Sequence, residues 1–467
     1  MKKTKLFLLL VFCAFLLNAQ KKPNVIFVLV DDLGWTDLAC YGSKYFETPH
    51  LDKLASQGMK FTNGYAAAAI CSPTRAACMT GKYPARIGIT DWIRARFQGG
   101  KIPTDKKNPS GMKLNKKNGL KVAVNPLWME HEEITIAEVL KEEGYKTGFI
   151  GKWHLGAPEW FPETQGFDVN FGGCDLGQPP SYFDPYVSKR NNPLYTIPNL
   201  KPRKKGEYLT DREAYEAEQF IKANKDKPFF LYLCNYAVHT PIQGQKHLIE
   251  KYEKKTKTNQ KSATYAAMVE AVDNCIGRIM KTLEEEGLAE NTLVIFTGDN
   301  GGLLGPTSNL PLRSGKGFPY EGGIREPLII RWPAKIKAGL VSDVPASSID
   351  FMPTICEATG AKLPNADIDG VSLMPVLEQK GKLAERALVW HFPHYRGKIH
   401  PYSIIRDNGW KLIKYYSGNV KYELFNLSED LGEKNEVSKK YPEKVKALET
   451  KMMKELKDMG ALIPTKG

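Results

Sequence analysis

The chain has 467 residues, enough for two or three domain-sized units or for one large α/β domain with a smaller one. Apolar residues make up 42% and charged residues 25%, which is typical of a globular protein and argues against a disordered chain. The net charge of +14 suits an anionic substrate or surface, but no nucleic-acid motif is present, so no nucleic-acid partner is expected. We interpret lysine pairs such as Lys106-Lys107, Lys116-Lys117 and Lys204-Lys205 as solvated surface.

The N-terminus has the pattern of an export signal. Three lysines among the first five residues precede the apolar run Leu6–Leu17, and the small residue Ala19 is followed by a polar stretch. This pattern predicts a signal peptide over residues 1–19 and therefore a periplasmic or secreted protein. The apolar run is too short to span a membrane comfortably, so no stable membrane span is expected after processing. Cleavage would leave a net charge of +11.

The cysteines form neither a dense disulfide framework nor a zinc motif. Cys234 and Cys275 fall in apolar stretches and are predicted to be buried thiols. An odd number of cysteines follows the leader, which leaves at least one thiol with a role of its own. These residues are Cys40, Cys71, Cys78, Cys174, Cys234, Cys275 and Cys356.

Up to about residue 370, expected strands alternate with expected helices. The strands are Asn24–Val30, Thr147–Ile150, Phe229–Tyr236, Leu293–Thr297 and Leu328–Trp332. The helices are one capped by Thr48 and closed by Gly58, one that starts with the capping box Thr135–Glu138, and Ser262–Leu283. The alternation predicts a mostly parallel α/β sheet in a catalytic domain over residues 20–370.

The pattern changes in residues 371–467, where a small antiparallel sheet plus helix is expected. Its helix is Pro442–Met459, and the Asp407–Gly409 segment predicts a hairpin turn. The expected strands are Ala387–Phe392, Ser403–Arg406, Trp410–Tyr416 and Tyr422–Asn426. Two long polar segments, Gln98–Asn125 and Gly177–Tyr208, are expected to be irregular and to line a site or its rim.

Two acidic or amide pairs directly follow expected strands. Asp31-Asp32 follow the first strand, and Asp299-Asn300 come just after Leu293–Thr297. Ligands of open α/β sheets collect beyond the carboxyl ends of strands. Three carboxylates and one amide oxygen suit calcium or magnesium rather than zinc. An isolated Asp-Asp is more often a cap or a turn, but two such pairs at strand ends favour a metal site.

Cys71 lies in a segment that predicts an anion-attracting helix start. Pro73 suits a first helical turn, so Cys71 is expected just before the helix N-terminus, where free N–H groups attract anions. Arg75 adds a positive charge nearby. The alternative is a structural buried cysteine, which the neighbouring proline, threonine and arginine disfavour.

Further basic residues lie near other strand ends. Lys152 and His154 are two apart after Thr147–Ile150, so in an extended chain they face the same side. Together they suggest anion binding and proton transfer. His239 follows another expected strand, and Lys316 lies in a glycine-rich loop that lacks Walker spacing. Each of these residues taken alone is also compatible with a structural role.

Five motifs in this order resemble the type I sulfatases, the formylglycine-dependent family of the alkaline-phosphatase superfamily. Cys71–Arg75 looks like the maturation signature, and Gly144–His154 is similar to the second signature at every position. The resemblance covers residues 24 to about 427, with mild departures at Cys78 and at Glu326, which we place outside the chemistry. It implies an alkaline-phosphatase-like fold: a large mixed, mostly parallel sheet flanked by helices, with a smaller C-terminal antiparallel sheet plus helix.

The resemblance implies a sulfuric ester hydrolase that acts on a sulfated carbohydrate. A formylglycine-generating maturation enzyme would oxidise Cys71, and the hydrated aldehyde would attack sulfur. A calcium ion, with magnesium as the alternative, would polarise the sulfate. The implied ligands of that ion are Asp31, Asp32, Asp299, Asn300 and the modified Cys71.

The resemblance also implies a role for each basic residue. Lys152 and Lys316 would neutralise the sulfate oxygens, and Arg75 would hold the formylglycine oxygen and its metal. His154 would take the proton that releases sulfate. His239, with Lys316, would protonate the leaving alcohol.

The expected substrate is a sulfated polysaccharide or its oligosaccharides, algal such as ulvan or carrageenan, or a glycosaminoglycan. The candidate sugar contacts are Arg94, Arg96, His391, His394 and Arg396, whose alternative is ordinary packing and rim salt bridges. Two other functions stay open at this point. One is a phosphatase, phosphodiesterase or phosphonate hydrolase of the same superfamily with Cys71 unmodified, and the other is a non-catalytic glycan-binding relative.

Overall fold

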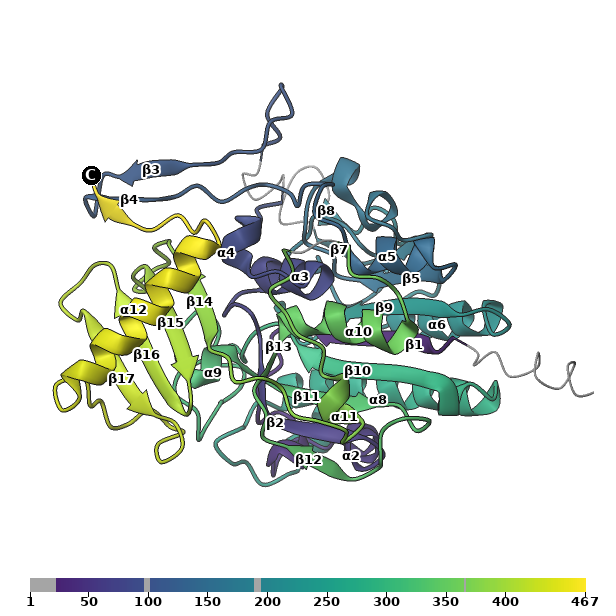
Figure 1. Cartoon of the computed structure of the whole chain (residues 1–467). Helices are drawn as coiled ribbons and strands as arrows, with labels where there is room; N and C mark the ends of the chain where they lie inside the picture. Colours follow the sequence, from purple (N-terminus) through teal and green to yellow (C-terminus); the bar gives the residue numbers. More distant parts are fainter. Residues whose placement is uncertain (1–21, 96–100, 189–194, 365–366) are drawn as a thin grey trace, which may run out of the picture.

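The computed structural model describes residues 22–95, 101–188, 195–364 and 367–467 (Figure 1). The expected signal peptide, residues 1–19, and the candidate contact Arg96 lie outside the described residues. Within these ranges no helix combines the length and the apolar character that a membrane span requires.

A nine-stranded mixed sheet forms the centre of the molecule. Strand β1 (Asn24–Val30) pairs in parallel with β10 (Thr292–Gly298) on one side and with β9 (Phe229–Asn235) on the other. Beyond β9, strand β5 (Lys146–Gly151) is also parallel. All residues of β1, β9 and β10 are buried, which explains why these strands are nearly continuous apolar runs in the sequence.

The side of the sheet beyond β10 is antiparallel. Strand β11 (Arg325–Arg331) runs antiparallel to both β10 and β2 (Met59–Tyr65). The remaining strands are β6 (Val169–Phe171), β12 (Leu340–Ser342) and β13 (Ala346–Ser347). The prediction of a mixed, mostly parallel sheet is therefore confirmed, although β2 was not anticipated because its buried and partly buried residues follow no clear alternation.

Helices cover both faces of this sheet (Figure 1). Alternate side chains of β1 point to opposite faces: Ile26, Val28 and Val30 pack into one apolar core, and the residues between them pack into another. Helices of the first core are α2 (Pro49–Ser56), α6 (Leu209–Ala223), α7 (Lys246–Glu253) and α8 (Ala263–Glu285). Helices of the second core are α3 (Cys71–Thr80), α5 (Ile136–Glu142), α10 (Phe351–Thr359) and α11 (Met374–Leu377). The short helices α4 (Pro84–Ile87) and α9 (Glu321–Ile324) complete this part.

The C-terminal residues form the predicted second sheet. Its antiparallel strands follow the order β14 (Leu388–Phe392), β15 (Tyr402–Asp407), β16 (Trp410–Tyr415) and β17 (Tyr422–Asn426). Asn408 and Gly409 both have positive φ, 45° and 79°, as the predicted hairpin turn requires. Helix α12 (Pro442–Asp458) lies across this sheet and buries Leu448, Met452 and Leu456 against it.

Two predictions of local structure need correction. Thr48 does not cap the backbone of α2; its hydroxyl accepts from the Ala39 N–H at 2.9 Å, and the helix ends at Ser56. The segment Gln98–Asn125 is not wholly irregular, because it contains β3 (Met112–Asn115) and β4 (Leu120–Ala123). Strand β4 also pairs with the C-terminal β18 (Thr465–Lys466), a long-range partner that local sequence cannot reveal. The other long segment contains β7 (Val187–Ser188) and β8 (Tyr195–Thr196).

A buried ionic cluster joins the C-terminal sheet to the main sheet. The Lys411 ammonium on β16 lies 3.0 Å from Glu321 at the start of α9 and 2.8 Å from Glu433. Arg325 on β11 pairs with the same Glu321 at 2.8 Å. Burial, and after it the charge of Glu321, raise the pKa of Glu433, and the charge of Lys411 is the main influence that opposes this rise.

We predict that Lys411→Met destabilises the fold by about 3 kcal/mol, because it leaves Glu433 buried without its cation. Chemical denaturation followed by fluorescence would measure the free energy of unfolding. The control is Lys414→Met on the same strand, which removes a less buried partner of Glu449 and should cost less. Equal losses for the two variants would contradict the prediction.

Candidate active site

The predicted site residues converge at one edge of the central sheet. Asp31 follows β1, Asp299 follows β10, Lys152 follows β5 and His239 lies shortly after β9. These four strands are parallel, so their carboxyl ends meet at the same edge. Helix α3 and the loop that carries Lys316 supply the remaining groups.

The two acidic and amide pairs form a buried oxygen cluster. The Asp32 N–H donates to Asp299 Oδ1 at 3.1 Å, and Asn300 Nδ2 donates to Asp32 Oδ1 at 2.7 Å. Asp31 Oδ1, Asp32 Oδ2 and Asn300 Oδ1 have no hydrogen-bond partner among the described residues. Buried oxygens without donors are costly, and carboxylate and amide oxygens are the ligands that calcium and magnesium prefer. The cluster therefore fits a hard divalent cation.

Cys71 lies next to this oxygen cluster. One ligand atom each from Asp31, Cys71 and Asp299 lie within 4.8 Å of one another. Cys71 is the first residue of α3 rather than the residue before it, because Ile70, with extended φ and ψ, takes the capping position. The thiol is thus placed both at the candidate metal site and at the N-terminal end of a helix.

Three cations oppose the three carboxylates. Arg75 Nε donates to Asp299 Oδ2 at 2.9 Å, and Arg75 Nη1 donates to the Lys152 carbonyl at 2.6 Å. Lys152 Nζ lies 2.5 Å from Asp31 Oδ2, and Lys316 Nζ lies 2.6 Å from Asp32 Oδ1. All of these side chains are at most 6% exposed. The charges therefore balance in a region that excludes water.

The two neighbouring aspartates differ in electrostatic environment. Burial, followed by the charge of Asp299, raises the pKa of Asp31. Burial would also raise the pKa of Asp32, but Lys316 and His239 outweigh it and hold that pKa well below its usual range. Of these two aspartates, Asp32 is therefore the one whose ionised form the neighbouring charges stabilise.

His154 is placed at the site by a backbone conformation that the sequence did not indicate. Its φ is +60°, so the chain is not extended here, and the extended-chain argument that placed Lys152 and His154 on one side does not hold. Nε2 lies 2.7 Å from the Ile93 carbonyl, while Nδ1 is buried without a partner among the described residues. The nitrogen bonded to the carbonyl must carry the proton, which leaves Nδ1 as an acceptor. Burial, followed by the charges of Lys152 and Arg75, lowers the pKa of His154 well below its usual range.

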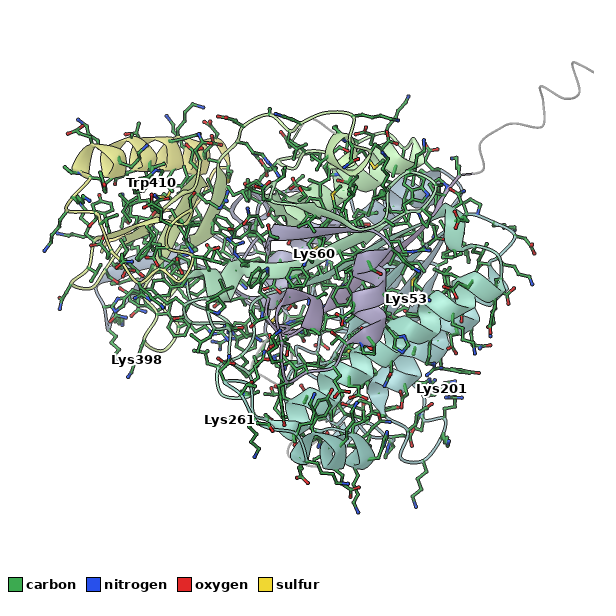
Figure 2. The ribbon with its side chains drawn as sticks, turned by 90° about the horizontal axis from the view of Figure 1, so that it is seen from below. Lys53, Lys60, Lys201, Lys261, Lys398 and Trp410 are labelled. Carbon is green, nitrogen blue, oxygen red and sulfur yellow. The ribbon has the colours of Figure 1, made fainter. Side chains whose placement is uncertain are left out.

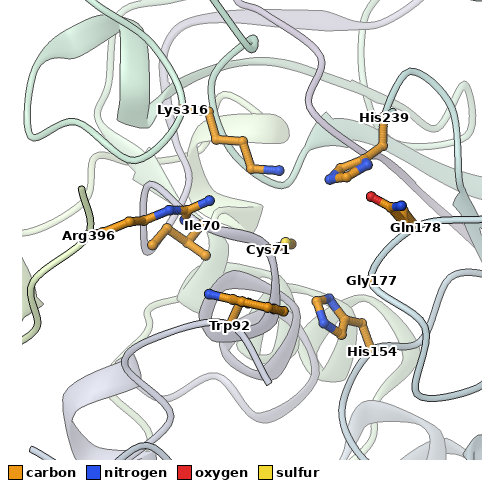
Figure 3. Close-up of a pocket in the computed structure, with 9 residues that line it drawn as sticks. All are labelled: Ile70, Cys71, Trp92, His154, Gly177, Gln178, His239, Lys316 and Arg396. Atoms are coloured by element: carbon orange, nitrogen blue, oxygen red, sulfur yellow. The ribbon is translucent and has the colours of Figure 1, made fainter. Parts of the chain in front are cut away.

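His239 approaches the cluster from the opposite side. Its Nε2 lies 3.6 Å from Asp32 Oδ2, and its Nδ1 lies 3.0 Å from the Thr240 carbonyl. Burial, followed by the charge of Lys316, lowers the pKa of His239 to about 3. The imidazole faces the same space as Lys316 (Figure 3).

These groups surround a cavity of about 170 Å³ that opens over Cys71 (Figure 3). Sequence reasoning did not single out Trp92 and Gln178. Gln178 belongs to the segment Gly177–Tyr208 that was expected to line a site or its rim, whereas Trp92 lies outside both such segments. Gly177 is required because a Cβ at this position would come 2.8 Å from the His154 ring. The residues of the wall are Ile70, Cys71, Trp92, His154, Gly177, Gln178, His239, Lys316 and Arg396.

The candidate sugar contacts fall into two groups. Among the described residues, Arg396 lines the cavity, whereas Arg94, His391 and His394 do not. Arg94 is exposed, with its guanidinium 5.5 Å from the centre of the Trp92 ring. His391 is buried between Ser403 Oγ at 2.7 Å and the Leu462 carbonyl at 3.2 Å, and His394 bonds Thr90 Oγ1 at 2.8 Å. The positions of these two histidines indicate packing of the C-terminal sheet.

Glu326 lies closer to the site than the sequence indicated. It is fully buried, and neither carboxyl oxygen has a hydrogen-bond partner among the described residues. A Cβ on Gly298, the residue before Asp299, would collide with it. Burial, followed by the charges of Asp299, Asp37 and Asp32, raises the pKa of Glu326 well above its usual range. Its neutral form therefore borders the oxygen cluster from behind.

Comparisons with known proteins agree with this geometry. The model of the family described as Sulfatase matches residues 23–361, and the one described as N-sulphoglucosamine sulphohydrolase, C-terminal, matches residues 314–461. The chain is 33% identical to a protein named Sulfatase from Formosa agariphila, with 89% of this chain and 84% of that relative covered. It is 32% identical to Arylsulfatase A from Homo sapiens, with 86% and 77% covered.

A solved structure is similar over nearly its whole length. The crystal structure of Ps i-CgsB in complex with k-i-k-neocarrahexaose matches with a TM-score of 0.77 and 31% identity, covering 93% of both chains. The family model spans well over half of the chain and includes every residue of the oxygen cluster, the thiol and the opposing cations. The chain is therefore a member of the sulfatase family, with the alkaline-phosphatase-like fold, and an enzyme that hydrolyses sulfate esters.

Proposed function

We propose that this sulfatase uses a formylglycine made from Cys71 together with a calcium ion, and that it removes sulfate from a carbohydrate. The observation that carries the proposal is the grouping of Cys71 with Asp31 and Asp299 beside three buried oxygens that lack donors. The hydrated aldehyde would supply one hydroxyl that attacks sulfur and a second whose deprotonation releases sulfate. Bound calcium, with magnesium as the alternative, would offset the carboxylate charge and polarise the sulfate oxygens.

The metal ligands would be Asp31, Asp32, Asp299 and Asn300, with the modified residue 71. Their oxygen donors suit a hard cation, and Lys152 and Lys316 contact Asp31 and Asp32. Lys316 lines the cavity and would bind a sulfate oxygen next to the ion, and Lys152, buried against Asp31, would add positive charge beside it. Arg75, fixed by Asp299 and by the Lys152 carbonyl, would hold the oxygen of residue 71.

We assign the two histidines to opposite proton transfers, as the family resemblance implies. His154 presents an unprotonated Nδ1 because its Nε2 is committed to the Ile93 carbonyl, so it can accept the proton whose removal releases sulfate. His239 borders the cavity beside Lys316, where a leaving alcohol would need a proton. Lys316 assists by placing a positive charge next to that oxygen.

The proposed substrate is a sulfated polysaccharide or its oligosaccharides. The support comes from Ps i-CgsB, solved with a neocarrahexaose, and from 35% identity to the N-acetylgalactosamine-6-sulfatase of Homo sapiens. A further structural neighbour, 27% identical, comes from work on glycosaminoglycan metabolism in Bacteroides thetaiotaomicron. Export through the predicted leader would bring the enzyme to such polymers.

We predict that mass spectrometry of the peptide that carries residue 71 detects formylglycine when the chain is expressed with a maturation enzyme. Cys71→Ala should lower kcat on an aryl sulfate by at least about 10³-fold, because the nucleophile is lost. Cys78→Ala, in the same helix, is the control and should remain active. Full activity with an intact thiol at residue 71 would contradict the mechanism.

We predict that calcium at about 100 times its Kd raises the melting temperature by about 3 °C, because a ligand bound only to the folded state adds about 2.7 kcal/mol. Asp299→Asn should abolish this rise. The control is Asp273→Asn, another buried carboxylate, which accepts from the Leu51 N–H at 2.7 Å away from the site. A calcium shift that persists in Asp299→Asn would count against the assigned ligand.

We predict that His239→Ala lowers kcat on a sulfated sugar by about 10²- to 10⁴-fold but lowers kcat on 4-nitrophenyl sulfate less than about tenfold. The reason is that a sugar alcohol needs a proton to leave, whereas nitrophenolate does not. The exposed His400→Ala is the control. Equal losses on the two substrates would show that His239 is not the acid.

A further inference from the structure

A basic hairpin projects beside the active-site cavity. We define it as residues 101–123, which contain strands β3 and β4 (Figure 1). It carries seven lysines against one acidic residue, Asp105, so nearly half of the net charge of the whole chain resides in this short segment. The lysines are Lys101, Lys106, Lys107, Lys113, Lys116, Lys117 and Lys121.

These lysines are available to a ligand. All seven are exposed. In the described part of the chain, their one ion pair joins Lys106 to Glu159 at 3.0 Å. An unpaired, solvated ammonium can bind an anion without breaking a protein contact first.

The base of the hairpin is tied to the wall of the cavity. Asn125, just after β4, accepts from the N–H groups of Thr90 and Asp91 at 3.1 and 2.9 Å. Its amide donates to the Asp91 carbonyl at 3.0 Å. The next residue, Trp92, lines the cavity (Figure 3). The hairpin therefore leaves the molecule directly at the mouth of the site.

Positive charges from the hairpin and from two arginines act on one carboxylate beside the cavity wall. Burial raises the pKa of Asp91 to about 6, and the charges of Arg396, Arg94 and Lys113 oppose that rise. Asp91 directly precedes Trp92, and both Trp92 and Arg396 line the cavity. The positive field of the hairpin therefore extends to the mouth of the cavity.

On the face shown in Figure 2, the labelled Lys201, Lys261 and Lys398 lie at well-separated places. Another exposed basic loop contains Lys201, Lys204 and Lys205, but none of these three residues lines the cavity. The basic hairpin contains no Phe, Trp or Tyr, so it lacks the stacking groups that single-stranded nucleic acids use. Its exposed large apolar residue is Leu114, at 49%, too little for insertion into a membrane. The positive charge of the hairpin and its position beside the cavity suit a polyanion that also enters the cavity.

We infer that the basic hairpin is an exosite for a sulfated polysaccharide chain. The lysines of the hairpin bind sulfates on the sugars that flank the sugar whose sulfate ester is hydrolysed. Arg396 contacts that sugar at the cavity. The inference rests on the proposed function, which makes the substrate a sulfated carbohydrate. It predicts that polymers and longer oligosaccharides bind more tightly than a sulfated monosaccharide, and that added salt removes this advantage.

The test compares Lys113→Ser/Lys116→Ser/Lys117→Ser with Lys201→Ser/Lys204→Ser/Lys205→Ser, which removes the same charge from another exposed loop. Affinity electrophoresis through ulvan, ι-carrageenan and chondroitin sulfate measures binding without requiring turnover. For at least one polymer, the hairpin variant should bind about tenfold more weakly at low salt, and the control should match the parent protein. Both variants should keep kcat/KM on 4-nitrophenyl sulfate within about twofold, because none of these lysines lines the cavity.

Unchanged polymer binding in the hairpin variant, or an equal loss in the loop control, would overturn the inference. So would a loss seen only with DNA or with vesicles that contain phosphatidylglycerol. Lys107→Ser/Lys121→Ser provides a second variant if the first one melts at a lower temperature than its parent. If the protein bound polymer through the hairpin but residue 71 carried no formylglycine, the proposed mechanism alone would fail.

Discussion

The burial of three carboxylates against three cations is the interaction on which the rest of the site depends. Asp31, Asp32 and Asp299 are almost fully excluded from water, and such charges are tolerated only when compensated. Arg75 comes from a helix, whereas Lys152 and Lys316 come from two loops, so three separate elements must pack correctly before the charges balance. The same arrangement places the thiol of residue 71 beside Asp31 and Asp299, so the packing of these elements also positions the candidate nucleophile.

The position of Lys316 depends in turn on the C-terminal sheet. Lys316 lies four residues before Tyr320, which caps helix α9, and the first residue of that helix is Glu321. Glu321 is bound by Lys411 from the second sheet and by Arg325 from the main sheet. The second sheet also supplies the segment that brings Arg396 to the cavity. It is therefore part of the site rather than an independent appendage.

The backbone around the two histidines fixes the orientation of each ring. His154 has its proton fixed on Nε2 by the Ile93 carbonyl, and Gly177 packs so closely on the ring that no side chain fits there. His239 is oriented by Thr240 and faces Asp32. Each imidazole therefore has one ring nitrogen beside a backbone carbonyl, which orients the ring and leaves its other nitrogen directed into the site.

The sequence by itself determined the central strands, the hairpin turn at Asn408 and the acidic and amide pairs at the strand ends, because apolar runs, turn residues and acidic strand ends act locally. It also predicted a role for Cys71 through the motif that this residue begins. Only the tertiary structure decided the rest. The left-handed turn at His154, the pairing of β4 with the C-terminal β18 and the separation of Arg396 from His391 all depend on contacts between distant segments. Contacts between distant segments cannot be predicted from a pattern of neighbouring residues, because they contribute free energy only when the chain is folded.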